Sequence, residues 1–180
     1  MVERLTYENP WIRVIHHDVI TPSGGEGIYG VVHYKNLAVG VVPIDDQGHT
    51  FLVGQHRFPL DQYSWEIPEG GGALGLDPIE SAARELEEET GLRASKWKEL
   101  VQADLSNSVS DERAIAFLAW ELTAGSARPE PTEELRVRRL PLTKAFEMVA
   151  AGEIRDALSV MSLQAVQLMQ VRGQLPCPWV

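Results

Sequence analysis

Hydrophobic and polar positions alternate in two segments near the start of the chain, residues 11–20 and 27–34. Alternation with a period of two is typical of β-strands that bury one face. Between the segments, residues 22–27 are rich in glycine and contain a proline, which favours a turn. We therefore predict an N-terminal hairpin or small antiparallel sheet.

Apolar residues also dominate residues 37–44 and 50–55, on either side of a polar turn at 45–48. This arrangement predicts a second hairpin. Three further strand patterns follow a glycine-rich stretch of the sequence. The last two of them lie on either side of a loop at 124–132 that contains proline, glycine and serine. These strands are predicted at 96–104, 113–123 and 135–141.

Three segments have helical signals. Residues 78–90 follow Asp77, a good N-cap, and end at Gly91, a good C-cap. Two more helices are predicted at 143–152 and 156–171. The last of these carries an apolar stripe that is best explained as core packing. The stripe consists of Val160, Met161, Leu163, Val166, Leu168 and Met169.

The helix at 78–90 is unusually acidic. At about 100° per residue, Glu85, Glu88 and Glu89 share an arc of about 100° beside the apolar face, whereas Glu87 points elsewhere. Like charges three or four residues apart cost about 0.2–0.5 kcal/mol per pair in a helix. Mg²⁺ would relieve this cost, because it prefers carboxylate oxygens. The alternative is a solvated acidic face.

The segment at 66–76, just before this helix, contains four glycines. Glycines allow a ligand to approach the backbone closely, and a helix N-terminus favours phosphate. Together, the loop and the acidic helix predict a site for a metal ion and a phosphate group.

Residues 70–92 resemble the signature of the Nudix hydrolases, Gly-x5-Glu-x7-Arg-Glu-U-x-Glu-Glu-x-Gly-U, in which U is a bulky aliphatic residue. The matching residues are Gly70, Arg84, Glu85, Leu86, Glu88, Glu89, Gly91 and Leu92. One position departs, because Leu76 stands where the family has a glutamate that pairs with the arginine. Glu80, one turn before Arg84, is a possible substitute partner.

Other segments resemble the ADP-ribose pyrophosphatase branch of this family: 55–57, 65–70, 106–112, 133–137 and 152–157. The resemblance implies an α/β (α+β) fold, with a mixed sheet between helices and a small N-terminal antiparallel sheet. It also implies a dimerising strand element at 1–36, a hydrolase domain at 37–180, and a homodimer.

The resemblance also implies a Mg²⁺ site, in which Mn²⁺ is a possible substitute. Glu85 and Glu89 would be direct ligands, Glu88 a ligand or a base, and the backbone carbonyl of Glu69 would complete the shell. Otherwise, Glu69 is an ordinary loop glutamate. Arg84 is the arginine of the signature, and we count it among the catalytic residues.

The general base in this branch often lies on a loop after the core strands. Glu133 is the first choice, with Glu130 and Glu134 as alternatives; a solvated acidic loop is the competing interpretation.

Candidate substrate-binding residues are Arg57, Glu112, Trp11 and Gly70. Arg57 would hold a phosphate through its planar fork, although a surface salt bridge explains it equally well. Glu112 follows a serine-rich turn in which Asn107-Ser108 replaces the family's proline-glycine. Trp11 would stack on a nucleobase, but single aromatic residues more often belong to a core or an interface.

Charge and composition limit the classes of partner that the protein is expected to bind. The chain has 180 residues and a net charge of −10, which argues against binding to nucleic acid or to an anionic membrane. Its single cysteine, Cys177, excludes an internal disulfide. The chain shows neither a signal-peptide pattern nor an apolar run long enough for a membrane span. A cytoplasmic protein is expected.

The acidic helix, together with the resemblance to the Nudix hydrolases and their ADP-ribose pyrophosphatase branch, implies Mg²⁺-dependent hydrolysis of the pyrophosphate bond of a nucleoside diphosphate sugar. ADP-ribose is the favoured substrate, and ADP-glucose and GDP-mannose are alternatives. The products would be a nucleoside monophosphate and a sugar phosphate. Two other functions remain open: a non-catalytic nucleotide sensor on the same fold, and a pyrophosphatase acting on dinucleoside polyphosphates or coenzyme A.

Overall fold

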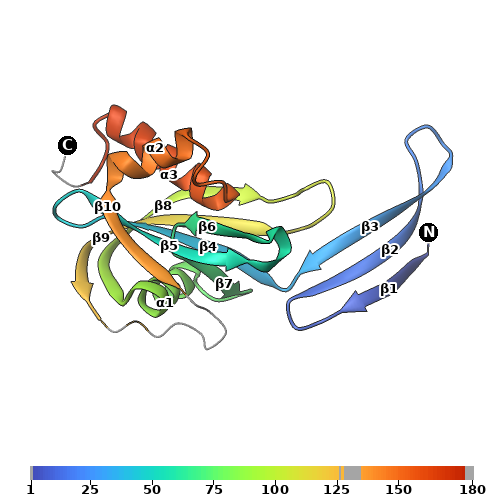
Figure 1. The fold of residues 1–180 in the computed structure, drawn as a ribbon. Helices are drawn as coiled ribbons and strands as arrows, with labels where there is room; N and C mark the ends of the chain where they lie inside the picture. The colour runs from blue at the N-terminus through green and yellow to red at the C-terminus, as the bar shows by residue number, and fades with distance from the viewer. Residues whose placement is uncertain (1, 126, 128–134, 177–180) are drawn as a thin grey trace.

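The computed structural model describes residues 2–125, 127 and 135–176. The first three strands form an antiparallel sheet in the order β1-β2-β3, which projects from the body of the molecule (Figure 1). These strands are β1 (Glu3–Glu8), β2 (Ile12–Ile20) and β3 (Glu26–Tyr34). The alternating pattern at 11–20 and 27–34 therefore predicted β2 and β3 correctly, and β1 adds a third strand.

The body contains a four-stranded sheet in the order β7-β4-β9-β8, in which β4 runs parallel to β9. The strands are β4 (Asn36–Pro43), β7 (Glu69–Ala73), β8 (Leu92–Asp104) and β9 (Arg113–Ala124). A second sheet has the order β10-β5-β6 and is antiparallel throughout. It consists of β5 (His49–Arg57), β6 (Gln62–Glu66) and β10 (Arg136–Pro141), with a short 3-10 turn, η1 (Phe58–Leu60), between β5 and β6.

Helices cover both sides of the body (Figure 1). α1 (Pro78–Thr90) packs Ala82 and Leu86 against Val39, Val41 and Phe117. α2 (Leu142–Ala150) and α3 (Ala157–Val171) cover a larger core on the opposite side. None of the helices in the described ranges is long and apolar enough to cross a membrane.

The predicted core stripe on the last helix is only partly correct. Leu163 and Val166 are fully buried, but Leu168 is 48% exposed. The buried face instead includes Ser159 and Ser162, because these serines share a helical face with Leu163 and Val166.

The predicted hairpin at 37–44 and 50–55 is wrong. β4 pairs with β7 and β9, β5 pairs with β6 and β10, and a single bridge between Ile44 and Thr50 connects the two segments. Residues Val39–Pro43 are all buried, so β4 is a central strand with a partner on each side. A continuous apolar run is typical of such a strand, whereas a half-exposed hairpin strand alternates.

The glycine-rich segment also differs from expectation, because much of it is a strand. Glu69–Ala73 forms β7, the edge strand beside β4, with Glu69 opposite Gly40. The glycines let α1 pack closely, since a Cβ at Gly72 would lie 3.1 Å from both Ser81 and Val39. Close packing of a helix on the strand, rather than loop flexibility, accounts for this glycine.

Candidate active site

Helix α1 begins and ends where its sequence predicts. The Asp77 carboxylate accepts a hydrogen bond from the Ile79 N–H at 3.0 Å, and Pro78 occupies the first turn. Gly91 ends the helix with a φ of 70°, and its N–H donates to the Glu87 carbonyl. These caps, with the buried Ala82 and Leu86, fix which side of the helix each glutamate faces.

The four glutamates of the acidic run have different surroundings. Glu89 is 5% exposed, and the side chain of Glu85 is 12% exposed. Glu88 lies at the rim, with its side chain 34% exposed. Glu87 makes an ion pair of 2.5 Å with Arg93. Glu85, Glu88 and Glu89 thus line the side of α1 nearest β7, as the helical phase predicted, and Glu87 pairs with the start of β8.

Arg84 connects two of these carboxylates to the glycine-rich strand. Its guanidinium donates to Glu85 Oε1 at 2.7 Å, to Glu88 Oε2 at 2.6 Å and to the Gly71 carbonyl at 2.8 Å. Partial burial lowers the pKa of Arg84, but the two carboxylates outweigh this effect and hold it above its ordinary value. Arg84 is therefore a permanent positive charge within the acidic arc.

The unusual Leu76 lies away from this arrangement and is 60% exposed. Among the described residues, the ion pairs of Arg84 are with Glu85 and Glu88, so Glu80 is not its substitute partner. The arginine is held by its own helix and by β7, without an acid at position 76.

Gly70 explains how Glu85 can lie against β7. A Cβ on Gly70 would overlap the Glu85 carboxyl group. The absence of a side chain therefore leaves room for the carboxylate beside the strand backbone. One residue earlier, the Glu69 N–H donates to Glu89 Oε2 at 3.0 Å.

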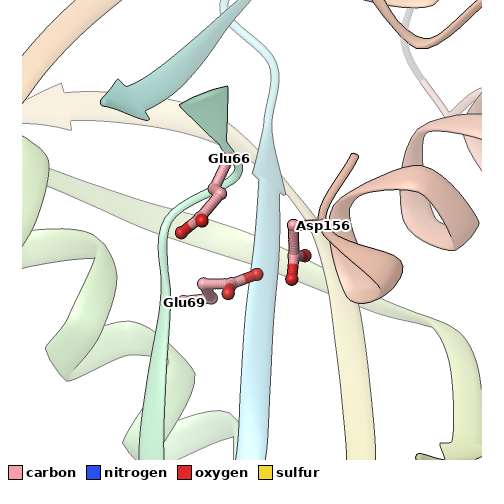
Figure 2. Close-up of side chains that lie close together, drawn as sticks. All are labelled: Glu66, Glu69 and Asp156. Atoms are coloured by element: carbon pink, nitrogen blue, oxygen red, sulfur yellow. The ribbon is translucent and has the colours of Figure 1, made fainter. Parts of the chain in front are cut away.

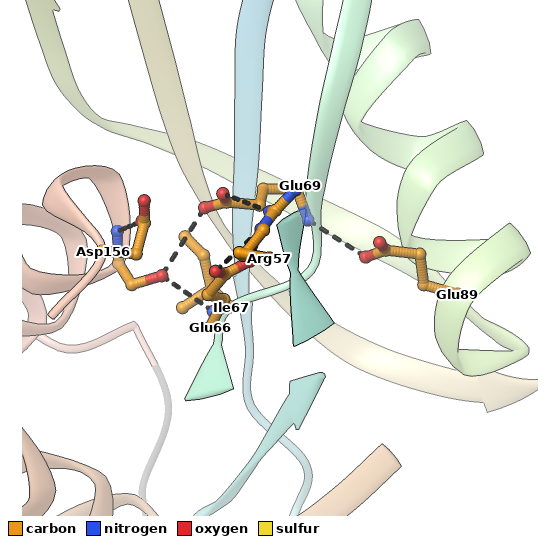
Figure 3. Close-up of polar contacts among 7 residues, drawn as sticks. Arg57, Glu66, Ile67, Glu69, Glu89 and Asp156 are labelled. Carbon is orange, nitrogen blue, oxygen red and sulfur yellow. Dashed lines mark hydrogen bonds and ion pairs between the residues drawn. The ribbon is translucent and has the colours of Figure 1, made fainter. Parts of the chain in front are cut away.

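The side chain of Glu69 points to a second acidic group, on the other side of the strand (Figure 2). Oxygen atoms of Glu66, Glu69 and Asp156 lie within 4.8 Å of one another. Arg57 binds this group: its Nε donates to Glu66 Oε1 at 2.9 Å, and its Nη2 lies 3.2 Å from Glu69 Oε1 (Figure 3). The salt bridge considered for Arg57 is therefore present, but it is half-buried and lies inside the site.

Burial raises the pKa of Glu69 well above its ordinary value, and the charges of Asp156 and Glu66 raise it further against the opposing effect of Arg57. Burial lowers the pKa of Arg57, but Glu66 and Glu69 more than reverse this, so its pKa is raised. The group contains more acids than bases, which favours a proton or a cation among the carboxylates.

Ser159 ties this region to helix α3. Its Oγ accepts a hydrogen bond from the Ile67 N–H at 3.0 Å and lies 3.5 Å from Glu69 Oε2. The Asp156 carboxylate caps α3 by accepting from the Ser159 N–H at 2.7 Å. Sequence reasoning missed Glu66, Asp156 and Ser159 as site residues. Two signals could have pointed to them: Glu66 and Asp156 lie in segments that resemble the family branch, and Asp156 precedes a predicted helix as an N-cap.

The acidic group and Arg57 lie along a cleft of about 430 Å³. Its charged walls are Arg57, Glu66, Glu69, Glu112, Arg155 and Asp156. Glu112 was predicted from the sequence, and the structure places it in the same cleft as Arg57. Burial raises the pKa of Glu112, and the charge of Asp156 adds to this.

Other predicted residues lie elsewhere. Trp11 is 64% exposed at the turn between β1 and β2, outside the set of residues that line this cleft. Glu133 and its alternatives Glu130 and Glu134 lie outside the described residues. A second hollow, of about 550 Å³, borders α1 and the start of β8, and its charged lining includes Arg84, Glu87, Glu88 and Arg93.

The acidic arc suits a hard divalent cation. Glu85, Glu88 and Glu89 lie on the side of α1 nearest β7, and all of their potential ligand atoms are oxygens, which Mg²⁺ and Mn²⁺ prefer over nitrogen or sulfur. The space that Gly70 leaves for Glu85 keeps one carboxylate against the backbone of β7. The residues present therefore fit a divalent metal ion.

Comparison with known proteins identifies the family. A NUDIX domain model matches residues 34–161, and a model of the nucleoside diphosphate sugar hydrolase N-terminal domain matches residues 3–32. An ADP-ribose pyrophosphatase of Bacillus subtilis is 34% identical over 155 residues, covering 85% of this chain and 83% of that protein. An ADP-ribose pyrophosphatase of Mycobacterium tuberculosis is 34% identical over 161 residues, covering 87% of this chain and 77% of that protein.

The fold comparison agrees. A crystal structure described as an ADP compounds hydrolase superposes with a TM-score of 0.85, covering 97% of this chain and 95% of that one, at 22% identity. The mixed sheet between helices and the small N-terminal sheet are thus a known arrangement. The chain belongs to the Nudix family of pyrophosphohydrolases, and it carries the N-terminal domain of the nucleoside diphosphate sugar hydrolases.

Proposed function

We propose that this protein hydrolyses the pyrophosphate bond of nucleoside diphosphate sugars with the help of Mg²⁺, and that ADP-ribose is its leading substrate. The observation that carries the proposal is the placement of three glutamates of α1 along β7: Glu85 lies against Gly70, Arg84 joins Glu85 to Glu88, and Glu89 accepts from the Glu69 N–H. The relatives named ADP-ribose pyrophosphatase support the choice of substrate.

The proposed metal site is built by α1 and the start of β7. Glu85 and Glu89 would be direct ligands, Glu88 a ligand or base, and the Glu69 carbonyl would complete the shell. When bound, Mg²⁺ neutralises charge on the phosphates and lowers the pKa of a bound water. Mn²⁺ offers the same preference for oxygen and would substitute.

The remaining chemistry belongs to the side chains. Glu133 would take a proton from the attacking water, whose oxygen adds to one phosphorus as the bridging P–O bond breaks. The released proton and the bridging oxygen end on the products, a nucleoside monophosphate and a sugar phosphate. Arg84 would hold Glu85 and Glu88 in position and add positive charge beside the phosphates.

Substrate recognition would use the cleft beside the metal site. Arg57 would contact a phosphate while its Nε remains on Glu66, and Glu112 would accept hydrogen bonds from sugar hydroxyl groups. Gly70 would let the diphosphate approach the strand backbone. Trp11 would stack on the nucleobase, and because it lies outside the cleft of its own chain, this role is best explained by a partner copy.

The proposal therefore includes a homodimer. Residues 1–36 would form the dimerisation element and residues 37–180 the hydrolase domain. Several large apolar side chains on the N-terminal sheet support this, since they are exposed in the single chain: Val2, Leu5, Tyr7, Ile20 and Ile28. A single cysteine fits the reducing cytoplasm that we propose as the location.

The test is a release assay with purified protein and a panel of substrates. ADP-ribose, ADP-glucose and GDP-mannose are compared with a dinucleoside polyphosphate and coenzyme A, each with Mg²⁺ and with EDTA. We expect the highest kcat/KM for ADP-ribose and no turnover in EDTA. Preference for a dinucleoside polyphosphate or coenzyme A would move the protein to another substrate class. Metal-independent nucleotide binding without turnover would instead indicate a sensor.

A further inference from the structure

The connection between β8 and β9, residues 105–112, is covered by β3 of the N-terminal sheet. The Val32 N–H donates to the Val109 carbonyl at 2.8 Å, and the Asp111 N–H donates to the Val32 carbonyl at 3.2 Å. The Tyr29 hydroxyl donates to the Ser108 carbonyl. β3 therefore binds this connection through both its backbone and a side chain, although the segments are nearly eighty residues apart in sequence.

Asp111 is the charged centre of this contact. Its Oδ1 accepts from the Tyr34 N–H at 2.8 Å, and its Oδ2 lies 2.7 Å from His33 Nδ1. Burial raises the pKa of Asp111, but the hydrogen bonds from His33 and Tyr34 outweigh it and leave the pKa below its ordinary value. Two hydrogen bonds from one strand to the same carboxylate fix the distance and the orientation of Asp111 relative to β3.

The two ends of the connection reach the substrate cleft. Leu105 and Glu112 both line it, and the Leu105 N–H donates to the Glu112 carbonyl at 2.8 Å. Glu112 directly follows Asp111, so adjacent residues bind β3 and line the cleft. Ser110 Oγ donates to the Leu105 carbonyl at 3.0 Å and keeps the connection folded on itself.

We propose that Asp111 is a positioning residue for substrate binding, through which the N-terminal sheet of the same chain sets the place of Glu112 in the cleft. This inference rests on the proposed function, because Glu112 is taken there to bind the sugar. It gives the N-terminal sheet a role in each chain's own site, separate from dimerisation.

The test compares Asp111→Ala with Asp18→Ala. Asp18 is a matched control, because it pairs with His16 at 3.1 Å in the same sheet and does not line the cleft. Asp111→Ala is expected to raise KM for ADP-ribose by about tenfold, which corresponds to about 1.4 kcal/mol, and to leave kcat nearly unchanged. Asp18→Ala should leave both constants near those of the wild type.

Two further variants refine the comparison. Asp111→Asn keeps an oxygen for the Tyr34 N–H but loses the negative charge beside His33, so its KM should lie between those of the wild type and Asp111→Ala. Asp111→Asn also provides the test of the positioning role if Asp111→Ala does not fold. His33→Ala combined with Asp111→Ala should raise KM little beyond the single Asp111→Ala effect, since both remove one interaction.

Hydrogen exchange in the substrate-free protein separates this inference from the proposed function. Backbone amides in 105–112 should exchange faster in Asp111→Ala than in Asp18→Ala. Equal exchange in the two variants, or equal KM values, would overturn the positioning role. If the wild type turned over no nucleoside diphosphate sugar, the proposed function would fail, and the claim that Glu112 binds a sugar would fail with it. The hydrogen-exchange result would still decide whether Asp111 holds the 105–112 connection in place.

Discussion

Glu89 is the residue on which the proposed metal centre depends most. It is almost fully buried, and it faces β7, as Glu85 does. One of its carboxylate oxygens accepts a hydrogen bond from the Glu69 N–H. A carboxylate in such a place costs free energy unless hydrogen bonds or a cation compensate for the loss of water. The Glu69 N–H offsets part of this cost, and we propose that a metal ion bound beside the same carboxylate would add to that compensation.

Glutamine substitutions test this interpretation. Glu89→Gln keeps an oxygen for the Glu69 N–H but removes the negative charge of a proposed direct ligand, so turnover should fall by at least about 100-fold, since loss of an outer-shell partner alone costs about 10- to 100-fold. Glu87→Gln is the control, because Glu87 pairs with Arg93 outside the arc. Steady-state kinetics with ADP-ribose provides the measurement. Equal losses in the two variants would contradict the assignment of Glu89.

Substitution of Gly70 provides a second test of the proposed metal site at the scale of one residue. A methyl group at this position would overlap the Glu85 carboxyl, which can move because it is the end of a flexible side chain. Gly70→Ala should therefore preserve the fold but raise the Mg²⁺ concentration for half-maximal activity by about 10- to 100-fold.

Gly25→Ala is the matched control for Gly70→Ala. A Cβ at Gly25 would meet only Thr21, at an ordinary contact distance of 3.5 Å. Unchanged Mg²⁺ dependence in Gly70→Ala would show that Glu85 does not need the space beside β7.

At the scale of elements, helix α3 supports the turn that carries Glu69. Ser159, fully buried in its first turn, accepts the Ile67 N–H between β6 and β7. Glu69 follows two residues later, with its N–H on Glu89 and its side chain beside Arg57. α1 and α3, which lie on opposite sides of the sheets, thus meet at one short backbone segment.

Two serines of α3 allow a matched stability experiment. Ser159→Ala leaves the buried Ile67 N–H without its partner and should lower the free energy of unfolding by about 1–3 kcal/mol. Ser162 is also fully buried, but its Oγ makes no hydrogen bond within the described part of the chain. Ser162→Ala should therefore be neutral or stabilising. Urea denaturation measures both, and equal losses would contradict the support role of Ser159.

The elements that the sequence predicted well are those with local signals. α1 is bounded by Asp77 and Gly91, whose capping roles depend on neighbouring residues alone. β7 was not predicted, because its glycines have weak strand propensity and it forms through pairing with β4 and packing under α1. Glu66, Asp156 and Ser159 converge only through tertiary packing, so no spacing in the sequence could have brought them together.

The whole molecule has an asymmetric shape, with the N-terminal sheet extending from the body (Figure 1). Ile28 on β3 is 73% exposed in this sheet. An exposed apolar side chain of this size, among several others, is typical of a surface that binds a partner. The sheet also contacts the 105–112 connection, so the proposed dimer surface and the substrate cleft share one structural support.

A lysine at Ile28 tests the dimer. Ile28 is largely exposed in the single chain, so Ile28→Lys should be accepted there without loss of the fold. At the proposed interface it would bury a charge and should convert the dimer to a monomer. Val171→Lys, at another exposed apolar site (80% exposed), is the control. Light scattering gives the mass, and a wild-type monomer or a dimeric Ile28→Lys would contradict the proposed surface.

The most direct test of the central claim is turnover of ADP-ribose as a function of Mg²⁺ concentration, with the products identified. We predict that AMP and ribose phosphate appear in equal amounts, that EDTA abolishes their formation, and that Mg²⁺ restores it. Unchanged ADP-ribose at saturating Mg²⁺ in folded protein, or turnover that persists in EDTA, would contradict a metal-dependent hydrolase built on Glu85, Glu88 and Glu89.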